Sequence, residues 1–111
     1  MMRRGDVVLI ADRSAGDYAG KPRPAVIVQS DLFDGTDSLV VCPLTTQQRD
    51  AQLLRIPVLP SPELRLQQQS WVMVDKLTAV RRDRVGDLVG RPTDEELLAL
   101  NRSLAVFLGF G

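Results

Sequence analysis

Residues 20–31, GKPRPAVIVQSD, contain the pattern that decides how this chain folds. An apolar run follows two prolines there and predicts a buried strand over residues 25–29. A proline holds the residue before it in an extended conformation, so Arg23 lies on stiff backbone. An arginine fixed at the entrance of a buried strand suits two roles. It can bind an anion such as phosphate through its planar set of donors, or it can pair with Asp6, Asp31 or another acid.

Short apolar runs continue on both sides of this strand. Turn-forming residues separate them at intervals of roughly 8–15 residues, which is typical of a small antiparallel barrel. Pro57 interrupts one alternating apolar run and therefore predicts an edge strand or a bulge. The expected strands are residues 7–11, 25–29, 39–44, 54–58, 71–80 and 85–89.

The apolar pattern changes to a helical period near the C-terminus. Thr93 and Glu96 have the spacing of a capping box, and acidic residues fill the first turn. With Gly109 as C-cap, a helix is expected over about residues 94–108. Its apolar stripe is expected to pack on the barrel, and a flanking set of apolar side chains indicates either more core or a homodimer contact. The stripe consists of Leu97, Leu100, Leu104 and Leu108, and the flanking set of Leu98, Val106 and Phe107.

Length and composition restrict the class of protein. A chain of 111 residues predicts one domain over residues 1–111, with the barrel at about 4–90. The 14 basic and 14 acidic residues balance, so an anion-binding surface has to be local. Histidine is absent, which excludes Ser–His and Cys–His nucleophile pairs. The single cysteine, Cys42, excludes internal disulfides and Cys-based zinc clusters, and its apolar neighbours favour a core position over a reactive thiol.

The sequence has no recognisable targeting or membrane-spanning segment. Charged residues at the start lead directly into a strand-like run, without the apolar region of a signal peptide. No apolar segment approaches the roughly 20 residues of a transmembrane helix. A cytoplasmic location is therefore expected.

Two hydroxyls follow the strand predicted over residues 39–44. Thr45 and Thr46 stand where the buried strand gives way to a polar loop that begins at Gln47. A hydroxyl at a strand end can donate a hydrogen bond to a phosphate oxygen. It can equally form a local turn bond, so both interpretations of Thr45 stay open.

An acid and a base interrupt the apolar strand predicted over residues 71–80. Successive strand residues point to opposite faces, so Asp75 and Lys76 do not share a face. The same alternation places Asp75 on the side of Trp71 and Met73. An acid on an apolar face indicates an ion pair with an arginine, a catalytic base, or both.

In their order along the chain, these segments resemble the MazF/PemK family of toxin endoribonucleases. The resemblance covers nearly the whole chain, and the order and spacing of the motifs carry it more than any single motif. It implies an SH3-like β-barrel with a C-terminal helix, working as a homodimer. The motifs are Arg4-Gly5-Asp6-Val7, Lys21-Pro22-Arg23-Pro24, Pro43-Leu44-Thr45, the apolar residues before Asp75, and the leucine helix.

The same resemblance implies a specific chemistry. The family cuts single-stranded RNA through attack of the ribose 2′-OH, without metal or cofactor, and leaves 2′,3′-cyclic phosphate and 5′-OH ends. Its catalytic pair matches Arg23 and Thr45, and an aspartate used by some members matches Asp75. Arg23 is then expected to stabilise charge on the phosphate, Thr45 to donate a hydrogen bond, and Asp75 to accept the proton.

The resemblance also implies where RNA and a protein partner bind. RNA is expected along a groove of the homodimer, and an antitoxin with an acidic, disordered tail occupies the same groove. Loops over residues 12–20 and 46–52 are expected to border it. Members that use the aspartate often carry an arginine at the position of Met73, for which Lys76 is the candidate replacement. The residues expected to contact RNA are Lys21, Thr46, Gln47 and Lys76.

Two other functions fit the same fold. CcdB-type gyrase poisons share the barrel but end in a Trp-Gly-Ile-type tail, whereas this chain ends in FLGFG and keeps the arginine–threonine pair. A non-catalytic SH3-like module that binds a peptide or nucleic acid is the other alternative. With one Trp and one Tyr in the chain, an aromatic groove or a base-stacking platform has little to form it.

Overall fold

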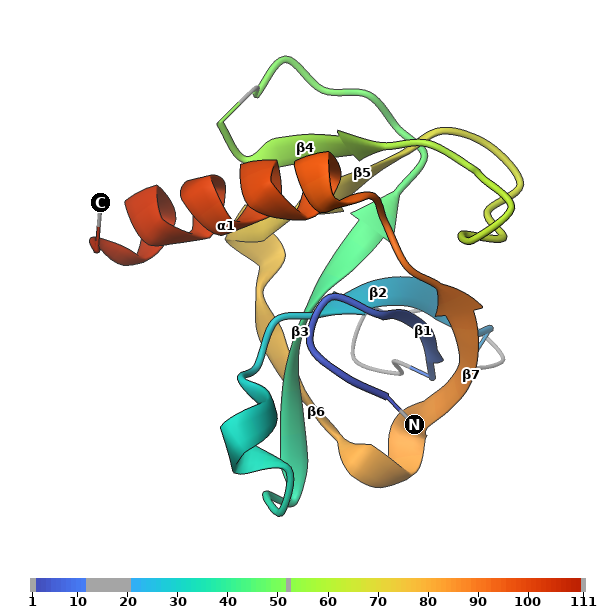
Figure 1. The fold of residues 1–111 in the computed structure, drawn as a ribbon, viewed down its shortest axis with the longest axis vertical. Helices are drawn as coiled ribbons and strands as arrows, with labels where there is room; N and C mark the ends of the chain where they lie inside the picture. The colour runs from blue at the N-terminus through green and yellow to red at the C-terminus, as the bar shows by residue number, and fades with distance from the viewer. Residues whose placement is uncertain (1, 12–20, 52, 111) are drawn as a thin grey trace.

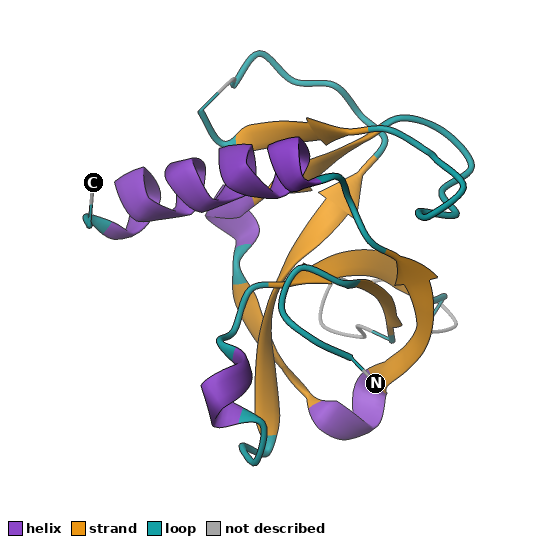
Figure 2. Cartoon of the chain, in the orientation of Figure 1, coloured by secondary structure: helices purple, strands orange, loops and turns teal. Residues whose placement is uncertain are grey.

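The apolar runs of the sequence form one curled antiparallel sheet, and a single helix packs across it (Figures 1 and 2). The computed structural model describes residues 2–11, 21–51 and 53–110. The expected mainly β fold with a C-terminal helix is confirmed. The elements are β1 (Val7–Ile10), β2 (Arg23–Ile27), β3 (Ser38–Thr45), β4 (Arg55–Val58), β5 (Ser70–Met73), β6 (Thr78–Arg81), β7 (Val85–Gly90), α1 (Asp94–Leu108), and the 3-10 turns η3 (Asp31–Phe33), η4 (Val74–Lys76) and η5 (Arg82–Arg84).

β3 is the central strand, because it pairs with three others. One side of it pairs with β2, and the other pairs first with β6 and then with β5. The sheet order is β4-β5-β3-β2-β1-β7, with β6 beside β3. The sheet thus curls into a barrel-like shape that is open between β6 and β7, where η5 carries the chain across. β4 lies at the edge, as Pro57 predicts.

The prediction of one continuous strand over residues 71–80 is wrong, because η4 separates β5 from β6. The register explains the break. Leu44 of β3 pairs with Val72, whereas Val41 pairs with Thr78. Between these two pairs, β3 advances by three residues, whereas the chain from β5 to β6 advances by six. The three additional residues are accommodated by η4.

α1 begins and ends where the sequence predicts. The Thr93 hydroxyl accepts a hydrogen bond from the Glu96 N–H at 3.1 Å, and the Glu96 carboxylate accepts one from the Thr93 N–H at 2.8 Å. This reciprocal capping box satisfies two donors at the start of the helix. Gly109 ends the helix in a left-handed conformation with a φ of 88°. No helix in the described ranges is long and apolar enough to cross a membrane.

Alternate residues of the central strands contribute to two apolar clusters. Val26 and Cys42 belong to the cluster beneath α1, whereas Ala25 and Ile27 belong to the second one. β2 is therefore buried on both faces, which accounts for its continuous apolar run. Burial raises the pKa of the Cys42 thiol to about 12, so the thiol is neutral and its core position is confirmed.

The apolar stripe of α1 is only partly buried. Leu100 and Leu104 are in the core, but Leu108 is 49% exposed. The flanking set of Leu98, Val106 and Phe107 is between 44% and 60% exposed, so it does not extend the core of this chain. The C-terminal end of α1 projects beyond the sheet in Figure 1, where no other element covers it.

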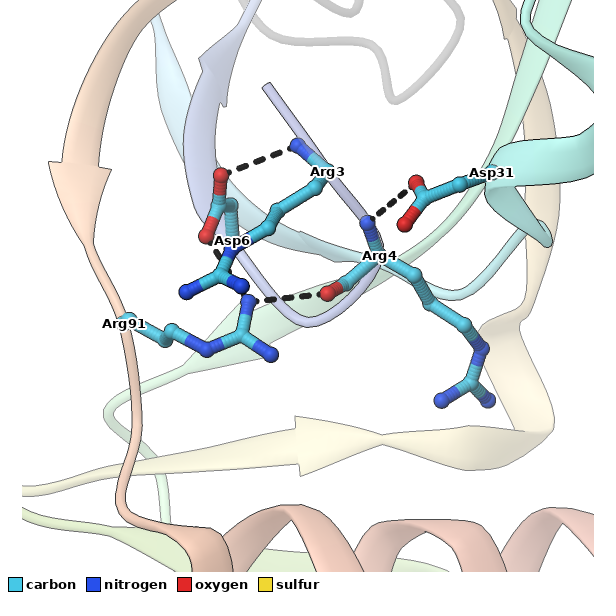
Figure 3. Close-up of polar contacts among 5 residues, drawn as sticks. All are labelled: Arg3, Arg4, Asp6, Asp31 and Arg91. Atoms are coloured by element: carbon cyan, nitrogen blue, oxygen red, sulfur yellow. Dashed lines mark hydrogen bonds and ion pairs between the residues drawn. The ribbon is translucent and has the colours of Figure 1, made fainter. Parts of the chain in front are cut away.

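The N-terminal Arg-Gly-Asp segment is fixed by a buried carboxylate (Figure 3). Asp6 is 5% exposed and accepts hydrogen bonds from Nη1 of Arg91 at 2.9 Å and from the Arg3 N–H at 3.0 Å. Nη1 of Arg91 also donates to the Arg4 carbonyl at 2.8 Å. These bonds join the start of β1 to the segment between β7 and α1.

Candidate functional site

The first residue of β2 and the last residue of β3 lie at the same end of the sheet. Ala25 of β2 pairs with Pro43 of β3. Continuing this antiparallel register by two residues brings Arg23 level with Thr45, on the same face as that pair. The register therefore brings the backbone of Arg23 and that of Thr45 to the same edge of the sheet, although the β2–β3 connection separates them in sequence.

Arg23 is exposed at the start of β2, where its backbone pairs with β1. The structural alternative for this arginine is an ion pair with Asp6 or Asp31. Asp6 binds Arg91, and Asp31 accepts a hydrogen bond from the Arg4 N–H at 2.7 Å (Figure 3). Both carboxylates therefore have other partners among the described residues, and the anion-binding role of Arg23 stays a prediction.

A cavity of about 370 Å³ opens beside Arg23. Sites for small ligands typically have volumes of roughly 300–1,000 Å³. Lys21, Arg23 and Arg65 contribute three cationic side chains to the lining, and none of the described lining residues is acidic. A locally positive surface thus exists on a chain of zero net charge. The lining consists of Leu9, Lys21, Pro22, Arg23, Pro24, Thr46, Arg65, Leu66, Gln67, Gln68, Ser70 and Val89.

Thr45 is half-buried and takes part in a turn. Its Oγ1 accepts a hydrogen bond from the backbone N–H of Gln47 at 3.1 Å. A hydroxyl has one donor and two acceptor positions, so this bond leaves its proton for a ligand. The turn bond and a phosphate contact are therefore compatible. Thr46 lines the cavity, and Gln47 is exposed.

Asp75 forms a salt bridge with Arg55 of β4. The side chains are 29% and 10% exposed respectively, so the pair is largely removed from solvent. η4 interrupts the strand, so alternation alone does not place Asp75. Its partner Arg55 stands directly opposite Met73 in the β4–β5 register, so the ion pair lies on the side of Met73. The ion pair with an arginine, one of the roles expected for Asp75, is therefore present in the structure. Its role as a proton acceptor stays a prediction.

Arg55 supplies the cation that is missing at Met73. The β4–β5 register pairs Arg55 directly with Met73, so the guanidinium comes from the neighbouring strand. Arg55 Nε is buried and has no hydrogen-bond partner among the described residues. The expected replacement, Lys76, is exposed and forms no ion pair with a carboxylate in the described ranges. Sequence reasoning missed Arg55 because only the strand pairing reveals its position.

The residues predicted to act on RNA occupy two places. One group lines or adjoins the cavity, whereas Asp75 and Lys76 lie on η4, outside its lining. Of the loops predicted to border a groove, residues 12–20 lie outside the described residues, and the second loop reaches the cavity through Thr46. The cavity group consists of Lys21, Arg23, Thr45 and Thr46.

The cavity also contains polar residues that the sequence interpretation treated only as loop. They belong to the β4–β5 connection and the start of β5. The run RLQQQS at 65–70 joins one arginine to several amides, and this is the signal that points to a ligand-binding loop. The residues are Arg65, Gln67, Gln68 and Ser70.

Comparison with known sequences identifies relatives over almost the whole chain. The family model for PemK-like, MazF-like toxins of type II toxin–antitoxin systems matches residues 3–108. A probable endoribonuclease MazF from Mycolicibacterium smegmatis is 46% identical over 108 residues, which is 97% of each chain.

Solved structures with the same fold include two mycobacterial endoribonucleases. One, in complex with its cognate antitoxin, has a TM-score of 0.78 and 24% identity, and the match covers 100% of this chain and 98% of that chain. The other has a TM-score of 0.72 and 26% identity, with coverages of 97% and 91%. The fold is therefore shared over at least 91% of each chain in both comparisons.

Proposed function

The chain belongs to the family of PemK-like, MazF-like toxins of type II toxin–antitoxin systems, and from this membership we propose that it is an endoribonuclease that cuts single-stranded RNA at specific sequences without a metal ion. The observation that carries the proposal is the cavity lined by Arg23 and two further cations, at the edge of the sheet to which the β2–β3 register also brings Thr45. Such a site suits a phosphodiester. The 46% identical relative named a probable endoribonuclease supports the same reaction class.

The proposed reaction is an internal transfer at phosphorus. The ribose 2′-oxygen forms a bond to the adjacent phosphorus as the bond from phosphorus to the 5′-oxygen breaks. The leaving 5′-oxygen takes a proton from solvent water, so a 2′,3′-cyclic phosphate and a 5′-OH result. Arg23 stabilises the negative charge that develops on the phosphate, and Thr45 donates a hydrogen bond to it. Arginine keeps its proton at neutral pH, so its role is electrostatic rather than acid catalysis.

The 2′-OH has to lose a proton as it attacks, and Asp75 is the proposed acceptor. The salt bridge to Arg55 holds the carboxylate in one orientation. Lys21 and Thr46 are proposed to contact the RNA inside the cavity, and the exposed Gln47 and Lys76 outside it. Contacts with Gln47 and Lys76 require the RNA strand to continue beyond the cavity along the surface.

A protein partner and a second copy of the chain belong to the same proposal. A cationic cavity attracts an acidic, disordered antitoxin tail as well as RNA, and the structurally similar mycobacterial endoribonuclease is known with its cognate antitoxin. The exposed apolar end of α1 offers a surface for a homodimer. RNA and antitoxin would then compete for one groove, so a bound antitoxin would block cleavage by occupying the RNA site.

Cleavage of a long single-stranded RNA in the presence of EDTA tests the proposal. Wild type is expected to cut at a small set of sequences and to leave 5′-OH ends. Arg23→Ala is expected to lose about 10²–10³-fold in rate, as is typical when one donor to a transition-state oxyanion is removed. The matched control is Arg102→Ala, which removes an exposed arginine of α1 that does not line the cavity.

This comparison is valid only if both variants have the same unfolding midpoint as the wild type. Antitoxin-free, folded wild type that cuts no RNA would contradict the proposal, and gyrase inhibition or plain peptide binding would be tested next. If Arg23→Ala cuts RNA as fast as the wild type, the catalytic centre does not lie in this cavity.

A further inference from the structure

The connection between β4 and β5 is fastened to the end of β7. Leu64 is fully buried and pairs with Gly90 in an isolated β-bridge. The next N–H, that of Arg65, donates to a carbonyl of β7 at 3.1 Å. Gly90 permits this approach, because its φ is +145° and a Cβ would stand 2.1 Å from the Glu63 carbonyl oxygen. This part of a long loop therefore has a fixed backbone.

Arg65 extends from this fixed backbone without an acid to neutralise it. Its Nη2 donates to the Leu88 carbonyl at 2.7 Å, which orients the guanidinium and uses one of about five N–H donors. No carboxylate in the described part of the chain forms an ion pair with Arg65. In contrast, Arg55, Arg81 and Arg91 each pair with an aspartate. The charge of Arg65 is thus oriented and available to a ligand.

Cations from two separate segments line one cavity. Figure 1 shows the β4–β5 connection beside the start of β2 and the end of β7. Arg65 belongs to this connection, whereas Lys21 and Arg23 come from the entry to β2. Like charges gathered in one cavity repel each other, and an anionic ligand removes that cost. The arrangement suits an anion with charge distributed along its length better than a single isolated phosphate.

We propose that Arg65 binds a second phosphate of the RNA strand, next to the phosphate that Arg23 contacts. The inference rests on the proposed endoribonuclease function and adds to it a binding residue outside the catalytic pair. Each nucleotide of a strand carries a phosphate, so a strand that places one at Arg23 presents others beside it. The planar donor fork of an arginine fits two oxygens of such a phosphate.

The test measures binding separately from cleavage. The probe is a short single-stranded RNA with 2′-O-methyl groups throughout, which lacks the attacking hydroxyl, and its anisotropy is followed over a series of salt concentrations. The variants are Arg65→Gln and the control Arg102→Gln, an exposed position of α1 outside the cavity lining. Arg65→Lys is the third variant, because it keeps the charge but loses the planar fork.

Arg65→Gln is expected to raise the Kd about tenfold, since hydrogen bonds to charged groups are among the stronger ones. Its plot of log K against log salt is expected to be shallower by about 0.7, the value for one phosphate contact on a single strand. Arg65→Lys is expected to keep the salt slope with an intermediate Kd. Cleavage of unmodified RNA by Arg65→Gln is expected to show a raised KM and an unchanged kcat, because the contact is the same before and during reaction.

The outcomes separate this inference from the proposed function. Equal Kd and salt slope for Arg65→Gln and wild type would overturn the second phosphate site, while cleavage by the wild type still supports the endoribonuclease. Arg65-dependent binding without any cleavage would support the phosphate site and contradict the endoribonuclease. If Arg65→Gln weakens binding of a polyglutamate peptide but not of the RNA probe, Arg65 serves a protein partner and the inference is wrong.

Discussion

At the scale of single residues, Gly5 shows how tightly the N-terminal segment is fitted. Its φ is +94°, and a Cβ there would stand 3.0 Å from both terminal nitrogens of Arg91. Gly5→Ala is therefore expected to lower the free energy of unfolding by roughly 1–2 kcal/mol, the usual cost of a left-handed conformation for an L-residue. Urea unfolding measures the difference.

Gly35→Ala is the matched control for this prediction, because a Cβ there has no atom within 4 Å and no positive φ to adopt. It is expected to change stability little. Equal losses for the two variants would mean that the fit around Arg91 is unimportant. A larger loss for Gly5→Ala alone would assign the Arg-Gly-Asp motif to stability rather than to RNA contact.

Single residues also show where sequence reasoning succeeds. Arg23 and Thr45 lie at strand ends that local patterns locate well, so their position at one edge of the sheet follows once the two strands are paired. Arg55 and Arg65 are different, because their roles depend on contacts between distant segments. Arg55 becomes the partner of Asp75 only through the β4–β5 register, and Arg65 enters the cavity only through the bridge to β7. The run RLQQQS at 65–70 marks Arg65 as part of a polar loop, but no local pattern shows which strand that loop contacts or that Arg55 faces Asp75.

At the scale of elements, local signals decide how well a boundary is predicted. α1 carries its own capping box and a left-handed C-cap, so its limits follow from a few neighbouring residues. The apolar run at 71–80 carries no signal for η4, since the break arises where β3 exchanges one partner strand for another. That exchange is a property of the sheet, and an apolar pattern alone does not record it.

The salt bridge between β4 and η4 separates the two roles of Asp75. If Asp75 accepts the proton, Asp75→Asn loses about 10²–10⁴-fold in kcat. Arg55→Met removes the cation that orients the carboxylate but leaves the carboxylate itself, so it is expected to lose less activity than Asp75→Asn in the folded state. Both variants are expected to cost roughly 1–3 kcal/mol of stability, because each leaves a largely buried partner unpaired. Single-turnover cleavage below the unfolding temperature measures the first effect, and urea unfolding the second.

A different pattern would reject the catalytic role. If Asp75→Asn and Arg55→Met cut RNA equally well and differ from the wild type only in stability, Asp75 is an ion-pair partner and nothing more. The proton acceptor would then have to come from a group other than Asp75. The position of Asp75 outside the cavity lining makes this comparison decisive for the proposed chemistry.

At the scale of the whole molecule, charge and apolar surface are concentrated in different places. The 14 basic and 14 acidic residues cancel, yet the described part of the cavity lining contains three cations and no acid. Binding to RNA is then expected to be local and to involve few phosphates, with little non-specific attraction by the rest of the surface. Three of the exposed apolar side chains of α1, Val106, Phe107 and Leu108, lie at its C-terminal end, which projects from the sheet (Figure 1).

This apolar end of α1 is the surface on which we expect the homodimer to form. Phe107 is 44% exposed there, beside Val106 and Leu108. Sedimentation velocity is expected to give twice the 12.3 kDa mass of one chain for the wild type, and Phe107→Arg is expected to weaken association at least about tenfold, because it places a charge in an apolar contact. Leu32→Arg is the control, since Leu32 is 85% exposed on η3. If Leu32→Arg rather than Phe107→Arg dissociates the dimer, the interface lies near η3. If active wild type sediments as a single chain, one copy suffices to cut RNA and the dimer groove is not part of the site.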